Sequence, residues 1–115
     1  MTQSELQHPK MQQYPFLKGM YQDAYFPDFL VDRCKDILID LCFQIETQSP
    51  KSLEELYTLS HAATDSFNEM EDDFLQNGSE IETAAREIIA VDFEQIALAY
   101  GFEADIEELI ATREW

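Results

Sequence analysis

One set of residues has the types and the spacing to bind a metal ion, namely His61, Asp65 and Glu69. They lie four residues apart in a segment predicted to be helical, so their side chains would line one face of that helix. Imidazole and carboxylate groups bind zinc and other divalent ions, but three ligands from one helix span too far to surround a single ion. Further ligands would have to come from elsewhere in the chain, for example Asp92 or Glu94. The alternative is a solvated face, because chance alignments are expected among 24 acidic residues.

A cluster of four acidic residues lies near the end of the same helical segment, at Glu69, Glu71, Asp72 and Asp73. Negative charge is unfavourable at the C-terminal end of a helix because of the helix macrodipole. The cluster therefore indicates either a solvated face or a surface that binds a basic partner or a divalent ion. It lacks the spacing and the central glycine of an EF-hand loop. These four residues are the predicted partner-binding residues.

Three further candidates carry weaker signals. His61 could act as a general base, but no serine or cysteine partner can be identified from the sequence. Glu5 and His8 have the Glu-x-x-His spacing of di-iron bundles, which need two such pairs on long core helices, and here a proline follows directly. Cys34 and Cys42 lie about 12 Å apart along one predicted helix, too far for a disulfide, and are predicted to be buried thiols. No catalytic residue and no cofactor is predicted.

The elements that would position these residues are predicted to be helices. Residues 27–46 carry apolar side chains at steps of three and four, which predicts an amphipathic helix that ends near Thr47. The same periodicity predicts long helices at 53–77 and 79–101 and a short one at 105–111. No strand or hairpin signal is present. The predicted fold class is all-α, a compact helical bundle of three main helices plus a short C-terminal helix.

Capping signals mark the ends of these helices. Ser52 and Glu55 have the spacing of a capping box, and Gly78 is typical of a helix C-terminus. Ser79 and Glu82 repeat the capping-box spacing at once. The repeat predicts that the third helix begins with almost no linker, so that two helices form a sharp hairpin.

The N-terminal part of the chain differs from the rest. Residues 1–13 are polar, Gln-rich and interrupted by a proline, and they show no helical or strand period, so disorder is predicted there. Residues 14–29 hold six aromatic residues, with two prolines and a glycine that prevent one continuous helix. They predict an aromatic-rich arm packed across the bundle, or an exposed binding patch. Residues 14–115 are predicted to form a single helical domain.

Charge restricts the classes of partner. The formal net charge is −17, from 24 acidic and 7 basic residues. Such a surface repels phosphate backbones and anionic lipids, so direct binding to nucleic acid or to a membrane is not expected, whereas a basic partner would be attracted. No apolar run approaches the roughly 20 residues of a membrane span, and no signal peptide is recognisable. A cytoplasmic location is predicted.

Six stretches carry a resemblance to a known family. They are residues 14–17 (YPFL), 20–23 (MYQD), 25–32 (YFPDFLVD), 79–87 (SEIETAARE), 99–102 (AYGF) and 107–115 (EELIATREW). Together they resemble the bacterial family named domain of unknown function 5713, over about residues 14 to 115, which is almost the whole predicted domain. The resemblance implies a small bacterial protein of unassigned activity, and it brings no catalytic or binding residues.

The sequence favours a non-enzymatic interaction module. It would bind a basic protein partner through its acidic surface, or self-associate through the aromatic arm, for example as a homodimer. Two alternatives stay open. One is a metal-assisted enzyme that uses His61, Asp65 and Glu69. The other is a nucleic-acid mimic that occupies a DNA-binding protein.

Overall fold

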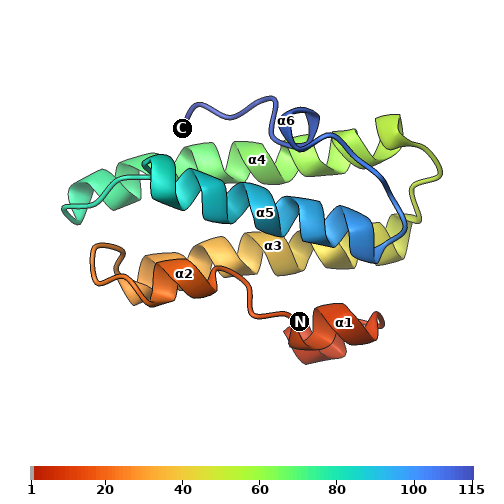
Figure 1. The fold of residues 1–115 in the computed structure, drawn as a ribbon, viewed down its shortest axis with the longest axis horizontal. Helices are drawn as coiled ribbons and strands as arrows, with labels where there is room; N and C mark the ends of the chain where they lie inside the picture. The colour runs from red at the N-terminus through yellow and green to blue at the C-terminus, as the bar shows by residue number, and fades with distance from the viewer. Residues whose placement is uncertain (1) are drawn as a thin grey trace.

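A computed structural model describes residues 2–115 of the protein, which consist of helices joined by short connections (Figure 1). The three long helices are α3 (Asp28–Gln48), α4 (Leu53–Gln76) and α5 (Thr83–Ala99). The shorter elements are η1 (Gln3–Glu5), α1 (Pro9–Gln13), α2 (Lys18–Tyr21) and α6 (Ile106–Leu109). Since residues 2–115 contain no strand, the predicted all-α bundle is confirmed. None of the helices described combines the length and the apolar character that a bilayer span requires.

The bundle is built on α3 and α4, which run antiparallel beside each other, with α5 packed on them and α6 lying across α4 (Figure 1). α3 forms because its apolar residues recur at helical spacing and bury one face. The buried residues of α3 are Leu30, Val31, Cys34, Leu38, Ile39, Leu41, Cys42 and Ile45. Phe67, Phe74 and Phe93 meet them from α4 and α5, and none of these three rings is more than 1% exposed.

α4 begins and ends where the sequence predicts. The Ser52 hydroxyl accepts a hydrogen bond from the Glu55 amide at 3.2 Å, as a capping box requires. At the other end Gly78 has a left-handed φ of 74°, and the Ser79 amide donates to the Phe74 carbonyl at 2.8 Å. This is a Schellman motif, in which glycine supplies the positive φ that other residues adopt only with strain.

α5 begins later than predicted, and the second capping box does not form. Its first residue is Thr83, and Glu82 occupies the N-cap position without a side-chain hydrogen bond. The Ser79 amide already donates to the Phe74 carbonyl, so it cannot donate to the Glu82 side chain as a second capping box would require. The intervening residues bring Ile81, which is 8% exposed, into the core. Burial of Ile81 therefore outweighs the local capping signal.

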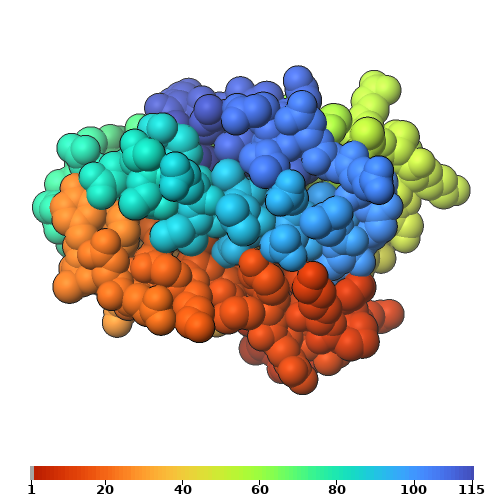
Figure 2. Space-filling view, in the orientation of Figure 1, coloured from red at the N-terminus to blue at the C-terminus, as the bar shows by residue number. Residues whose placement is uncertain are grey.

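The N-terminal segment, residues 2–13, also differs from its prediction. The sequence predicts disorder at residues 1–13, whereas the structure places residues 2–13 against the bundle; Met1 lies outside the described residues. Leu6 is 1% exposed and Met11 is fully buried. Figure 2 shows this segment, in red, packed against the last turns of α5, in blue. Sequence reasoning missed it because Leu6 and Met11 are separated by a spacing that fits neither a helix face nor a strand face.

The aromatic arm, residues 14–29, mostly joins the core. Phe16 is 1% exposed and Phe26 is 2% exposed, and two of the arm's tyrosines pack partly buried against the core. Tyr25 and Phe29 remain 40% and 50% exposed. The arm is therefore chiefly a packing element, with an exposed pair of rings near the start of α3.

Asp92 of α5 fastens this arm to the bundle. Its carboxylate accepts hydrogen bonds from the Tyr14 hydroxyl at 2.9 Å and from the Leu17 amide at 2.7 Å. Leu17 has a left-handed φ of 58°, and α2 starts directly after it. Burial raises the pKa of Asp92, although both hydrogen bonds act in the opposite direction. Asp92 thus positions α2 through Leu17. The sequence suggested Asp92 only as a possible metal ligand and did not predict this role.

Candidate functional site

The predicted metal ligands do not converge. The Nε2 atom of His61 lies 2.6 Å from the Glu108 carbonyl oxygen, which can only accept, so Nε2 carries a proton. The His61 ring also stacks on Tyr57, with 6.1 Å between centroids. Asp65 and Glu69 are exposed. In the part of the chain that the structure describes, no three His, Cys, Asp or Glu residues are placed to hold a metal ion. His61 instead holds the α6 region on α4, and the metal site remains a prediction from sequence.

Glu5 and His8 contact the backbone rather than each other. The Glu5 carboxylate accepts from the Thr2 amide at 2.8 Å. His8 accepts from the Lys10 amide through Nδ1 at 3.2 Å, which caps the first turn of α1. Their Glu-x-x-His spacing is therefore a coincidence of two local caps.

The two cysteines are buried free thiols, as predicted. Both are 0% exposed on the inner face of α3. Burial raises the pKa of Cys34 and Cys42 to about 12 in each case, with Glu46 adding to the effect at Cys42. Neither thiol is a candidate nucleophile, because the reactive form is the thiolate.

The four predicted partner-binding residues have different surroundings. Glu69 and Asp72 are exposed, whereas Glu71 and Asp73 are half-buried. An Asp73 oxygen lies 3.7 Å from an Arg33 nitrogen of α3, so its charge is partly compensated. Burial raises the pKa of Glu71, and the nearby carboxylates of Glu114 and Asp72 raise it further. Glu71 therefore lies among like charges and forms no ion pair within residues 2–115.

Glu71 also lines a pocket of about 340 Å³ between α4, the start of α5 and the C-terminal residues, here called the acidic pocket. Its lining residues are Glu71, Leu75, Glu80, Ile81, Arg86, Glu114 and Trp115. Three carboxylates thus face one guanidinium around an apolar floor. Glu80 and Glu114 could not be assigned to this site from the sequence, because they come from segments that meet α4 only in the folded bundle.

The floor of the acidic pocket is held in place from two sides. The Trp115 ring is 7% exposed and packs on Phe67 with 5.9 Å between centroids. Arg86 Nε donates to the Trp115 carbonyl at 3.1 Å. Leu75, by contrast, is 56% exposed at the rim. The pocket therefore offers a fixed apolar floor, a free apolar rim and a surplus of negative charge.

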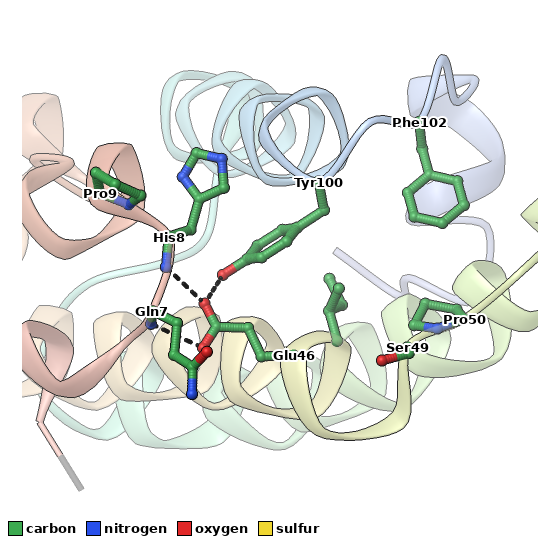
Figure 3. Close-up of a pocket in the computed structure, with 9 residues that line it drawn as sticks. Gln7, His8, Pro9, Glu46, Ser49, Pro50, Tyr100 and Phe102 are labelled. Atoms are coloured by element: carbon green, nitrogen blue, oxygen red, sulfur yellow. Dashed lines mark hydrogen bonds between the residues drawn. The ribbon is translucent and has the colours of Figure 1, made fainter.

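A second pocket, here called the aromatic pocket, lies at the other end of the bundle. It has a volume of about 540 Å³ and is lined by the N-terminal segment and by residues at the ends of α3 and α5 (Figure 3). Its lining residues are Gln7, His8, Pro9, Ile45, Glu46, Ser49, Pro50, Tyr100 and Phe102. The two pockets share no lining residue, because the acidic pocket is lined by the end of α4, the start of α5 and the C-terminal residues.

Glu46 is the central polar group of the aromatic pocket. Its carboxylate accepts from the Gln7 amide at 2.9 Å, from the His8 amide at 3.1 Å and from the Tyr100 hydroxyl at 2.5 Å (Figure 3). Burial alone would raise the pKa of Glu46, but the hydrogen bonds from Tyr100, Gln7 and His8 outweigh it and lower the pKa. Glu46 is therefore a fixed, ionised carboxylate at neutral pH.

Tyr100 is held between its neighbours. The His8 ring meets it edge-on, with 5.2 Å between centroids. Burial raises the pKa of Tyr100 well above its ordinary value, and the hydrogen bond to Glu46 raises it further, so the hydroxyl stays a donor. A Schellman motif follows, in which Gly101 has φ 89° and the Phe102 amide donates to the Ala97 carbonyl at 2.9 Å. This turn sets both aromatic rings at the pocket.

Comparison with known proteins adds a family but no activity. No curated protein and no solved structure matches the chain. A family model described as a family of unknown function, DUF5713, matches residues 10–115, which contain the acidic pocket and most of the aromatic pocket. Because the match covers nearly the whole chain, this protein belongs to the DUF5713 family, as the resemblance implied.

Proposed function

We propose that this protein is a non-enzymatic interaction module that binds a basic, partly apolar segment of another protein at the acidic pocket. The observation that carries the proposal is the lining of that pocket, in which Glu71, Glu80 and Glu114 surround an apolar floor. Lysine and arginine side chains combine an apolar stem with a charged head, so they match such a lining. We also propose a cytoplasmic location for the protein, as predicted from the sequence.

The charge distribution supports a basic partner. Within residues 2–115 the ion pairs are those of Arg33 with Asp73 and of Arg113 with Glu107. Most of the 24 acidic residues therefore form no ion pair in the part of the chain that the structure describes. Charges of one sign accelerate association with an oppositely charged partner, and salt weakens this effect because the Debye length is only about 8 Å at 0.15 M.

The raised pKa of Glu71 supports the location. Burial disfavours its ionisation most, and its like-charged neighbours Glu114 and Asp72 add to the effect in the free protein. A bound ammonium or guanidinium group would relieve this repulsion. Exposed Leu75 would gain from burial under an apolar residue of the partner.

Other functions have less support. Self-association, the metal-assisted enzyme at His61, Asp65 and Glu69, and the nucleic-acid mimic remain predictions from sequence. The aromatic arm offers two exposed rings, Tyr25 and Phe29, for self-association.

Fluorescence anisotropy with a labelled peptide of alternating lysine and leucine tests the proposal. The variant Glu71→Gln/Asp72→Asn/Glu114→Gln should bind the peptide about tenfold more weakly, since each lost exposed ion pair contributes about 0.2–1 kcal/mol. The control Glu54→Gln/Glu87→Gln/Glu103→Gln removes the same charge from exposed positions elsewhere. Equal weakening by the two triple variants would show that net charge alone binds the peptide, and would refute a site at the acidic pocket.

A further inference from the structure

The aromatic pocket has the composition of a ligand site rather than of a packing defect. Its volume of about 540 Å³ lies within the range of roughly 300–1,000 Å³ that is typical of small-molecule sites. In Figure 3 the rings of Tyr100 and Phe102 lie on one side of the space, and Glu46 and Pro50 line the other. The walls are thus aromatic and aliphatic around one carboxylate.

No lysine or arginine compensates the charge of that carboxylate, and the His8 imidazole, whose positive charge when protonated helps to lower the pKa of Glu46, is the one basic side chain in the lining. The lining includes neither lysine nor arginine, and Glu46 forms no ion pair with either residue type within residues 2–115. All three of its hydrogen-bond donors, two backbone amides and the Tyr100 hydroxyl, are neutral groups. A carboxylate has about four acceptor positions, so one of them remains for a ligand.

The same hydrogen bonds fix the site before a ligand arrives. Glu46 is held from the N-terminal segment and from α5 at once, and the turn at Gly101 orients Tyr100 and Phe102. Ser49 ends α3 in a left-handed conformation with φ 48°, which brings Pro50 to the opposite wall. A preformed site loses less conformational entropy on binding than a flexible one.

We propose that the aromatic pocket binds an organic cation, that is, an ammonium, guanidinium or quaternary ammonium group on an apolar body. The positive charge would lie beside Glu46 and within about 6 Å of an aromatic face, where the ring quadrupole attracts it. The apolar body would cover Ile45 and Pro50. The cation could belong to a free amine or to a lysine or arginine side chain of a partner protein.

Titration of the isotopically labelled protein, followed by amide NMR, tests this proposal with named probes. The cationic probes are acetyl-lysine amide, acetyl-arginine amide and choline, and acetyl-norleucine amide is the neutral analogue. We expect the cations, but not the norleucine compound, to shift the amide signals of Gln7, His8 and Ser49. Stronger binding of the two amino acid amides would assign the site to a partner's side chain, and stronger binding of choline would assign it to a free amine.

Three variants locate the binding. Glu46→Gln should weaken binding of the cationic probes about tenfold, because a charge-assisted hydrogen bond is lost. Phe102→Leu leaves the hydrogen bonds between Glu46 and the N-terminal segment in place. It should weaken binding of the cationic probes about threefold, the loss expected for one cation–π contact. Glu87→Gln, which removes an exposed carboxylate of α5 outside the pocket, should leave affinity unchanged. Far-UV circular dichroism and melting temperatures confirm that each variant folds.

Either of two results would overturn the proposal. Equal binding of the norleucine compound would show an apolar groove without charge selectivity. Unchanged signals of Gln7, His8 and Ser49 at millimolar concentrations of every probe would show that no cation site exists. The cationic probes should bind equally well to the acidic-pocket variant Glu71→Gln/Asp72→Asn/Glu114→Gln. That result would show that they bind at the aromatic pocket, so each of the two proposals can fail without the other.

Discussion

At the residue scale, two carboxylates hold the first part of the chain on the bundle. Asp92 binds the Leu17 amide and the Tyr14 hydroxyl, and Glu46 binds the amides of Gln7 and His8. These hydrogen bonds join backbone amides of the first 17 residues to side chains of α3 and α5, and so fix the position of the donating segment on the bundle. Both carboxylates therefore act as anchors.

Asp92 is the more deeply buried anchor, and its amide and alanine variants should differ. Asp92→Ala leaves the buried Leu17 amide without an acceptor and should lower the free energy of unfolding by about 2–4 kcal/mol. Asp92→Asn can accept from Leu17 and donate to the Tyr14 hydroxyl, so its loss should stay below about 1 kcal/mol. Urea unfolding followed by circular dichroism measures both values. Equal losses would contradict the anchor.

The pH dependence of Asp92 has a definite sign. Burial raises its pKa in the folded state, so the folded protein binds this proton more tightly than the unfolded chain. Its contribution is therefore fully present below the unfolded pKa and is lost as pH rises through the folded pKa. The stability of the wild type should accordingly improve relative to Asp92→Asn on acidification from pH 7.

Neither anchor could be predicted from the sequence. The Leu17 amide lies 75 residues from Asp92, and the Gln7 amide lies 39 residues from Glu46. A carboxylate that binds a distant amide leaves no local pattern, unlike one that caps its own helix. Asp92 and Glu46 are thus indistinguishable in the sequence from the solvated majority of 24 acidic residues.

At the scale of elements, apolar periodicity predicted the three long helices, and a capping box predicted the start of α4. Two elements escaped prediction for physical reasons. α5 starts at Thr83 rather than after Ser79, whose amide closes α4 and so cannot complete a capping box. The N-terminal segment is ordered by two non-periodic apolar residues and by Glu46. Tertiary contacts outweighed local signals in both places.

A pair of serine variants tests the reading of the caps. Ser52→Ala should lower the free energy of unfolding by about 1 kcal/mol, the usual loss for an N-cap. Ser79→Ala should be neutral or stabilising, because its buried Oγ has no hydrogen-bond partner. Chemical denaturation of both variants measures the difference. A larger loss of unfolding free energy for Ser79→Ala than for Ser52→Ala would contradict this assignment and would indicate that Ser79 caps α5.

The attachment of the N-terminal segment should depend on pH through Glu46. Its pKa is lowered in the folded state, so its contribution is present above the unfolded pKa and is lost as pH falls through the folded pKa. We expect the protection factors of the Gln7 and His8 amides to fall about tenfold or more between pH 6 and about pH 3. Amide exchange measured by NMR reports this directly. Glu46→Gln, which cannot titrate, should show no such change, and an equal change in that variant would refute the anchor.

At the scale of the whole molecule, the net charge of −17 is the dominant property. Repulsion among like charges opposes the compact state, and salt screens it. Raising sodium chloride from 0.02 to about 0.5 M should therefore raise the melting temperature by at least about 4 °C, which corresponds to about 1 kcal/mol in a domain of this size. An unchanged melting temperature would show that repulsion among the acidic groups does not destabilise the folded protein measurably.

The most direct test of the proposed function is to map where a basic segment binds. An NMR titration of the labelled protein with the unlabelled lysine and leucine peptide reports every amide at once. The proposal predicts the largest shifts at Glu71, Leu75, Glu80 and Glu114 around the acidic pocket, and their loss in high salt. Small shifts spread evenly over the acidic surface, or shifts centred elsewhere, would contradict it.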